Sequence, residues 1–370
     1  MSPSIPPPSA QRPPGLTPAR PGTALVLGGG GITGALYELG CLAALEDHVP
    51  GFLATDFELY VGTSAGATVA ACLAGAVPAR RMYRALLDPH DDFFPLERRH
   101  FFRFDTTEWR RVVASAVGAV RRATMHMVTE PQAFDLWQEL DRFYDSLPAG
   151  IFDLGAYESF LSGFFARRGI SDRFEDLPRR LLVPAADLDE GARVVFGAGR
   201  HAHVPVSRAV CASSALPVLF APVQVGARDY VDAGAGRAAH ADLALRWGAD
   251  FVLIINPVVP VRNDPSGVSV PTGHGPRSRV RDKGLLWVYE QALRTAFHAR
   301  LGAEVAGLRE RVPHATFGLL EPDLHDATLF MHSPMNFGAR RTILRHGYDT
   351  AVAWLRAEAE PLRARFGEPV

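Results

Sequence analysis

Lysine is almost absent from this chain of 370 residues: Lys283 is the only one, and arginine supplies the other basic side chains. Forty acidic residues balance 39 basic ones, which gives a formal net charge of −1. We interpret the arginines as a compositional bias and expect no nucleic-acid partner.

Cysteine is also scarce. Cys41, Cys72 and Cys211 stand among apolar residues without metal-binding or redox spacing, so we expect buried free thiols and no disulfide framework.

Long apolar runs are missing as well. No stretch approaches the 18 or more apolar residues that read as a membrane-spanning helix. Residues 1–22 are rich in proline and serine and lack the apolar core of a signal peptide, so we expect a disordered tail there. These absences favour a cytoplasmic protein and leave open its attachment to a membrane surface. A chain that is 47% hydrophobic can form one large α/β domain with additions.

Two apolar runs near the N-terminus each lead into a glycine-rich turn and then into a helical pattern. Residues 24–27 and 59–61 are expected to be strands, and residues 32–47 and 65–76 are expected to be helices. Strands that alternate with helices in this way are typical of an α/β fold with a mostly parallel sheet.

The rest of the chain divides by composition. We expect a catalytic domain over 23–257, interrupted by a helical insert at about 80–176 that acts as a cap or lid. Residues 258–282 carry proline, glycine, serine and arginine without periodicity, which indicates a mobile loop. Residues 283–370 are expected to form a helical extension packed on the catalytic domain.

One segment of the insert is amphipathic. Apolar side chains from Trp109 to Val120 fall on one helical face, and the neighbouring arginines fall on the other. Two interpretations stay open: an ordinary helix laid on the core, or a lid or interfacial element that faces lipid.

The second glycine turn, Gly62-Thr63-Ser64-Ala65-Gly66, has the pattern G-x-S-x-G. Flanking glycines permit a strained turn that lifts the Ser64 hydroxyl out at the carboxyl end of a strand, and the following helix N-terminus favours negative charge nearby. Ser64 is therefore a candidate nucleophile. The alternative is a tight turn with a serine that caps the helix.

The first glycine turn, Gly28 to Gly31, offers backbone N–H groups. Gly29-x-Gly31-x-x-Gly34 also matches the dinucleotide-binding fingerprint, but that site requires an acidic residue at the end of the second strand, and here that strand ends in the serine turn. An oxyanion hole is the better interpretation, in which the N–H groups stabilise a developing alkoxide. A purely structural turn is the third alternative.

A serine nucleophile needs a base. The chain offers several histidines (His240, His298, His314, His325 and His332 among them), and none has a distinctive setting. Asp232 competes with them, because it follows an apolar strand and precedes Ala233-Gly234, another small-residue turn at a strand end.

The glycine loop, the serine turn and the aspartate turn follow one another in an order that resembles the patatin-like phospholipase family of lipid acyl hydrolases. The resemblance covers roughly residues 23–257. The resemblance rests on Leu27–Gly34, Gly62–Gly66, Ala212–Pro217 with Phe220–Pro222, and Val231–Gly234.

The resemblance implies a three-layer α/β/α fold, a lipid or ester substrate, no metal and no cofactor. It also implies a Ser–Asp dyad, with Ser64 as nucleophile and Asp232 as base. The expected oxyanion-hole donors are Gly29, Gly30 and Gly31, and the glycines that support the motifs are Gly28, Gly34, Gly62, Gly66 and Gly234.

Two positions depart from the family pattern. Thr33 stands where the family usually carries arginine or lysine, and Ala233 stands where glycine is usual. A catalytically silent lipid-binding protein therefore remains an alternative, as does an α/β-hydrolase esterase with a Ser-His-Asp triad. The exact lipid, the bond cleaved and the oligomeric state are left open.

Overall fold

A computed structural model describes residues 17–88, 90–101, 103, 106–129, 137, 141, 144–145, 147–235, 239–264, 266, 270–272 and 275–367. Residues 1–16 of the predicted disordered tail lie outside this range. The first strand already begins at Arg20, inside the segment predicted as tail.

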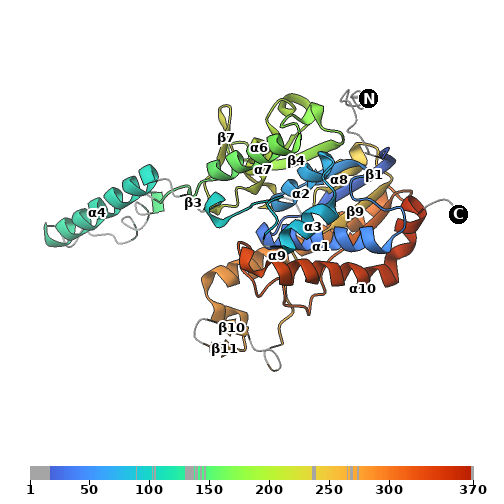
Figure 1. Ribbon diagram of the computed structural model, residues 1–370. Helices are drawn as coiled ribbons and strands as arrows, with labels where there is room; N and C mark the ends of the chain where they lie inside the picture. Colours follow the sequence, from blue (N-terminus) through green and yellow to red (C-terminus); the bar gives the residue numbers. More distant parts are fainter. Residues whose placement is uncertain are drawn as a thin grey trace.

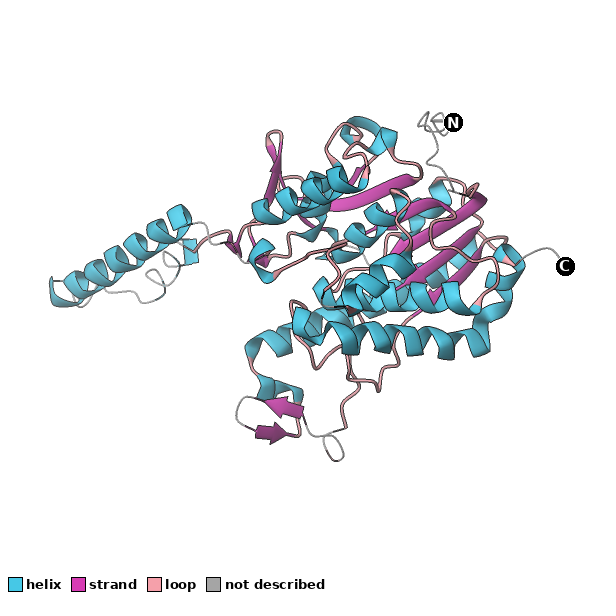
Figure 2. Ribbon diagram, in the orientation of Figure 1, coloured by secondary structure: helices cyan, strands magenta, loops and turns pink. Residues whose placement is uncertain are grey.

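A mixed eight-stranded sheet forms the centre of the molecule (Figure 2). Its strands are β1 (Arg20–Leu27), β2 (Phe57–Gly62), β4 (Arg180–Asp187), β5 (Ala192–Phe196), β7 (Val223–Val225), β8 (Arg228–Asp232), β9 (Phe251–Ile255) and β12 (Thr316–Leu320). They lie in the order β12-β9-β1-β2-β4-β8-β7, and β5 also pairs with β4. The pairs from β12 to β4 are parallel, whereas β5, β7 and β8 are joined by antiparallel pairs. The predicted α/β class with a mostly parallel sheet is confirmed.

Helices cover both faces of this sheet. The α-helices are α1 (Gly31–His48), α2 (Ala65–Ala74), α3 (Ala79–Leu87), α4 (Thr106–Thr129), α6 (Gly155–Arg168), α7 (Val206–Ser214), α8 (Ala241–Arg246), α9 (Leu285–Arg311) and α10 (Arg340–Phe366). The 3₁₀ turns are η1 (Arg98–His100), η2 (Phe174–Asp176), η3 (Gly199–His201), η4 (Ala233–Ala235), η5 (Val280–Lys283) and η6 (Phe337–Ala339). One core cluster joins the sheet to α1, α2, α7 and α10, and a second joins it to α8 and α9.

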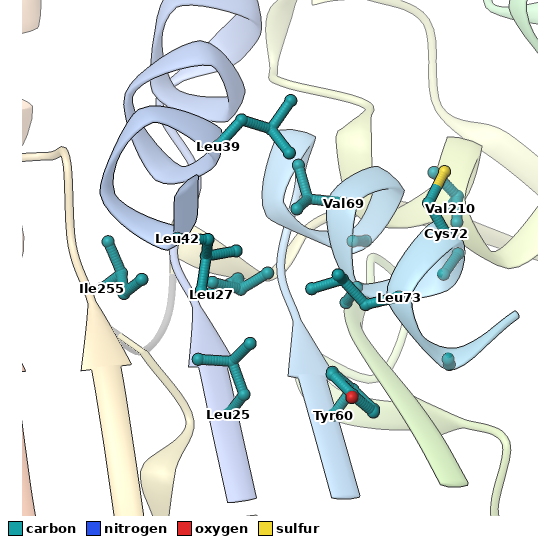
Figure 3. Packing of buried hydrophobic residues seen from close by; sticks show 14 of the residues in the cluster. Leu25, Leu27, Leu39, Leu42, Tyr60, Val69, Cys72, Leu73, Val210 and Ile255 are labelled. Carbon is teal, nitrogen blue, oxygen red and sulfur yellow. The ribbon is translucent and has the colours of Figure 1, made fainter. Parts of the chain in front are cut away.

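Alternation along β1 produces these two cores. Successive side chains of a strand point to opposite faces, so Leu25 and Leu27 enter one cluster while Ala24 and Val26 enter the other. Figure 3 shows the larger cluster, where leucines of β1 and α1 pack beside α2. Because both faces are covered, the strand sequence is continuously apolar, as is typical of buried parallel sheets.

The insert does not lie on the core throughout its length. Helix α6 packs into the larger cluster through Phe164 and Phe165, but α4 extends away from the body of the molecule (Figure 1). Its base is held where the Trp109 indole Nε1–H donates to the Ile151 carbonyl, 3.2 Å away. Ile151 belongs to β3 (Gly150–Phe152), which pairs with β6 (Val218–Phe220). The amphipathic segment is therefore a projecting helix and not one laid on the core.

Two segments after residue 257 differ from expectation. The segment predicted as a loop contains a hairpin of β10 (Val270–Thr272) and β11 (Gly275–Arg277), followed by η5. The C-terminal extension contributes β12 to the central sheet, so it shares that sheet with the catalytic domain. Helix α10 continues to Phe366 beyond a kink near Glu358 and Pro361, where proline removes a backbone donor.

The three cysteines are buried and free, which confirms the expectation for them. In the described part of the chain, no helix combines the length and apolar character needed to cross a membrane.

Candidate active site

Ser64 occupies the sharp turn between β2 and α2. Its backbone has φ 55° and ψ −129°, an uncommon conformation for a residue with a side chain, and strain of this kind clusters at functional sites. The turn needs small neighbours: a Cβ on Gly66 would lie 2.0 Å from the Gly28 carbonyl oxygen. The Ser64 N–H donates to the Ser213 hydroxyl at 2.9 Å, which fixes the turn against α7. Ser64 is only 8% exposed.

Asp232 reaches Ser64 through the register of the sheet. Leu182 of β4 pairs with Val61 of β2, so β4 continues beyond the end of β2 to Ala185, which pairs with Asp232 at the end of β8. The Ser64 hydroxyl lies close enough to the Asp232 carboxyl to lower its pKa. The two turns therefore meet. The antiparallel direction of β8 was not expected from the sequence.

The environment of Asp232 favours its protonated form. Asp232 is 5% exposed, and burial raises the pKa of its carboxyl from 3.8 to about 6. Two groups oppose this shift: the Ser64 hydroxyl, and the Gly234 N–H, which donates to Oδ1 at 2.8 Å. A carboxylate with a pKa near 6 is a better proton acceptor than an ordinary aspartate and is still ionised at neutral pH.

The first glycine turn lies directly beside the serine. A Cβ placed on Gly29 would lie 3.1 Å from Ser64 Cβ and 3.6 Å from Ser64 Oγ. Gly30 has φ 107°, which glycine adopts readily and other residues rarely do.

The carbonyl groups of this loop point toward the start of α1. The Gly30 carbonyl accepts from the Gly34 N–H at 3.0 Å and from the Thr33 hydroxyl at 3.3 Å. The Gly29 carbonyl oxygen lies against Gly34, only 2.3 Å from where a Cβ would stand. In a trans peptide the N–H points opposite to the C=O, so the Gly30 and Gly31 N–H groups face away from α1.

The loop N–H groups remain available. Within the described residues no acceptor is found for the N–H groups of Gly29, Gly30 or Gly31. Helices α1 and α2 begin at Gly31 and Ala65, so two helix N-termini with their positive dipole ends flank Ser64.

The supporting glycines form close backbone contacts around the same point. The Gly28 N–H donates to the Ile255 carbonyl at 3.1 Å, and a Cβ on Gly62 would lie 2.6 Å from the Ala67 Cα. With Gly34, Gly66 and Gly234, whose contacts are given above, the structure brings all ten of the predicted site residues into one region.

The two departures from the family pattern do not disturb this geometry. Thr33 is fully buried, and its hydroxyl holds the Gly30 carbonyl. Ala233 is buried in η4 and is not among the described residues with positive φ, so its turn does not require glycine.

The histidines that could have formed a triad lie elsewhere. Buried His240 neighbours the Arg193 guanidinium at 3.2 Å, and His298 neighbours Glu321 at 3.5 Å. His314 and His325 are exposed, and His332 is half-buried. Among the described residues, no histidine acts on the Asp232 carboxyl, and no group of three or more potential ligands could hold a metal ion.

Sequence reasoning missed two residues of this region. Ser213 lies inside a segment that carries the family resemblance, but nothing in its pattern showed that it would bind the Ser64 backbone. Glu38 is a fully buried carboxyl on α1. The apolar residues around it in the sequence were the only indication that it would be buried. Burial raises the pKa of Glu38 well above its usual value. The nearby Gly28 N–H donates to Ile255, and neither Glu38 oxygen has a partner among the described residues.

Comparison with known proteins identifies the family of the chain. The family model of patatin-like phospholipases matches residues 25–245, more than half of the chain. The chain therefore belongs to the patatin-like phospholipase family, and this membership indicates a lipid hydrolase. No curated protein sequence gives a significant match.

Solved structures resemble the chain loosely. VipD from Legionella pneumophila is 14% identical with a TM-score of 0.36, and the match covers 92% of this chain and 67% of that one. The type III effector ExoU is 15% identical with a TM-score of 0.38 and coverages of 92% and 53%. ExoU in complex with SpcU, from Pseudomonas aeruginosa, is 16% identical with a TM-score of 0.33 and coverages of 92% and 54%. The chain thus spans about half the length of ExoU, and likenesses this loose do not bear on the function.

Proposed function

We propose that the protein hydrolyses carboxylic ester bonds of phospholipids or related lipids through an acyl-enzyme on Ser64, with Asp232 as the base. The observation that carries this proposal is the Ser64 hydroxyl, which lies near a buried carboxyl and beside a loop of available N–H groups. Membership of a lipid-hydrolase family supports the substrate class.

In the first half-reaction, Asp232 accepts the proton of the Ser64 hydroxyl as Oγ bonds to the ester carbonyl carbon. The carbonyl π electrons move onto oxygen and form a tetrahedral oxyanion. When this intermediate collapses, the C–O bond to the alcohol breaks, and Asp232 returns the proton to the leaving alcohol. The acyl group then remains on Ser64.

In the second half-reaction, water replaces the alcohol. Asp232 accepts a proton from water as its oxygen attacks the acyl carbon, and the bond to Ser64 Oγ breaks. The proton returns to Ser64, and the fatty acid leaves as the second product. The dyad is then ready for another turnover.

The glycine loop stabilises both oxyanions. The N–H groups of Gly29, Gly30 and Gly31 lack acceptors among the described residues, and the helix N-termini at Gly31 and Ala65 add a favourable field. A donor of this kind stabilises a transition state by about 2.7–4 kcal/mol in studied enzymes.

Lipid-product analysis tests the proposal. The wild type is expected to release free fatty acid from phospholipid substrates, and Ser64→Ala is expected to release none above background. Ser159→Ala is the matched control, because it makes the same change on an exposed face of α6. Equal release by wild type and Ser64→Ala would overturn the assignment of the nucleophile. A folded wild type that releases nothing would favour a silent lipid-binding protein.

A further inference from the structure

Two parts of the described chain expose apolar side chains in groups. The α4 ridge consists of Val113, Val117 and Val120, which are 59–68% exposed and follow one face of the projecting helix. The α9 patch consists of Leu285, Leu286, Val288 and Tyr289 at the start of α9, where Leu285 is 83% exposed.

Exposed large apolar side chains are concentrated in these parts of the molecule. Outside 113–147 and 285–293, the only ones among the described residues are Leu53, Leu188 and Val218. Val218 belongs to β6, which pairs with the strand that holds the base of α4. Soluble surfaces rarely expose large contiguous apolar patches unless these contact a partner or a membrane.

Both groups are bordered by positive charge. The sequence of α4 contains four arginines and one acidic residue, Glu108, and Arg110 and Arg121 are exposed beside the α4 ridge. The segment before the α9 patch carries the exposed residues Arg277, Arg279 and Arg281, with Asp282 as the one acidic residue between 270 and 289. Apolar side chains flanked by basic ones are typical of helices that lie in a membrane interface.

The α4 ridge and the α9 patch both extend from the edge of the sheet that holds the dyad. The Arg294 guanidinium of α9 donates to the carbonyls of Pro257 and Val259, at 3.3 Å each, just after the carboxyl end of β9. The base of α4 is tied to β3, and the partner strand β6 follows Ala215, whose carbonyl accepts the Asp232 N–H at 3.0 Å. Figure 1 shows both elements on the side away from the start of β1 and the end of α10.

We propose that the α4 ridge and the α9 patch form one docking face for an anionic lipid bilayer. Their apolar side chains insert into the interface, and the bordering arginines contact acidic headgroups. The choice of a bilayer over a protein partner rests on the charge around both groups and on the attachment of both elements at the sheet edge that holds the dyad. In that respect it rests on the proposed function, because the substrate would then lie in the surface to which the protein binds.

Vesicle co-sedimentation tests the docking face. Full-length Ser64→Ala protein, which leaves the lipids intact, is mixed with vesicles of phosphatidylcholine with or without phosphatidylserine. We expect binding to the vesicles that contain phosphatidylserine and weaker binding as salt is raised. Val117→Asp/Val120→Asp and, separately, Leu285→Asp/Leu286→Asp should each weaken binding by about tenfold or more. Leu53→Asp is the matched control, because Leu53 is 41% exposed in the segment that leads into β2, at the opposite edge.

The outcomes separate this inference from the proposed function. Hydrolysis of a soluble short-chain ester, measured with Ser64 intact, should be unchanged in both double variants. The double variants could lose vesicle binding while the protein with Ser64 intact cleaves no ester. That combination would support the docking face and reject the proposed hydrolysis. Equal binding by the Ser64→Ala protein with and without either double substitution, no vesicle binding at all, or equal binding with and without phosphatidylserine would each overturn the docking face.

Discussion

Replacement of Asp232 by asparagine is expected to abolish hydrolysis and to stabilise the fold at neutral pH. The amide has nearly the same shape, and its oxygen can still accept the Gly234 N–H that now donates to Oδ1. It cannot accept the Ser64 proton, so the rate of ester cleavage should fall by a factor of about 10²–10⁴.

The gain in stability follows from the raised pKa. A shift of the Asp232 pKa from 3.8 to about 6 costs about 3 kcal/mol once the carboxyl is ionised, because the unfolded chain ionises more easily. The folded state binds the proton more tightly, so wild-type stability is lost as pH rises from about 4 to about 6 and then stays level. Asp232→Asn should recover up to about 3 kcal/mol at pH 7 and almost nothing below pH 4.

Denaturant unfolding at a series of pH values, paired with an ester assay, measures both effects. Asp189→Asn provides the control, because it makes the same change on the exposed turn after β4. A variant that loses activity but is also less stable than the wild type at pH 7 would refute the claim that ionised Asp232 destabilises the folded protein. A variant that keeps full activity would refute its role as the base.

Three further changes probe the support of the dyad. Gly29→Ala should lower kcat by about tenfold or more, because a methyl group 3.1 Å from Ser64 Cβ crowds the nucleophile. Steady-state kinetics measure this beside the control Gly302→Ala, where a Cβ meets nothing. An unchanged kcat in Gly29→Ala would contradict the prediction. Ser213→Ala leaves the buried Ser64 N–H without its acceptor, so unfolding should show a loss of about 1–3 kcal/mol, and a loss near zero would contradict the role of that hydrogen bond. Glu38→Gln should raise stability at pH 8, because the wild type is expected to lose about 1.4 kcal/mol per pH unit above 4.5 until the raised pKa of Glu38 is reached. Parallel curves of stability against pH for the two proteins would contradict this prediction.

Much of the fold could be predicted because it depends on local patterns. The buried strands β1 and β9 are short apolar runs bounded by turn residues, and the helices after the two glycine turns follow at once. Residues 316–320 form the strand β12. What the sequence did not reveal was the placement of β12 in the central sheet, since strand pairing between distant segments leaves no local pattern.

The position of the candidate site was predictable for a similar reason. Its groups lie on turns that need glycine or a small residue, and such turns are visible in the sequence, as at Gly28 to Gly31 and around Ser64. The direction of β8 was not visible, and neither was the register that sets Asp232 opposite Ala185. Ser213 and Glu38 act through packing, so no motif marks them. The projection of α4 was also open, because an amphipathic pattern does not say what covers its apolar face.

Site mapping with a fluorophosphonate probe tests the dyad most directly. The probe bonds to an activated serine, and peptide mass spectrometry then identifies the labelled residue. We predict a single adduct, on Ser64, that forms faster as pH rises through about 6, the pKa of the Asp232 carboxyl, and that forms far more slowly in Asp232→Asn. An adduct on another serine, labelling of Ser64 independent of Asp232, or no adduct in the folded wild type would contradict the assignment.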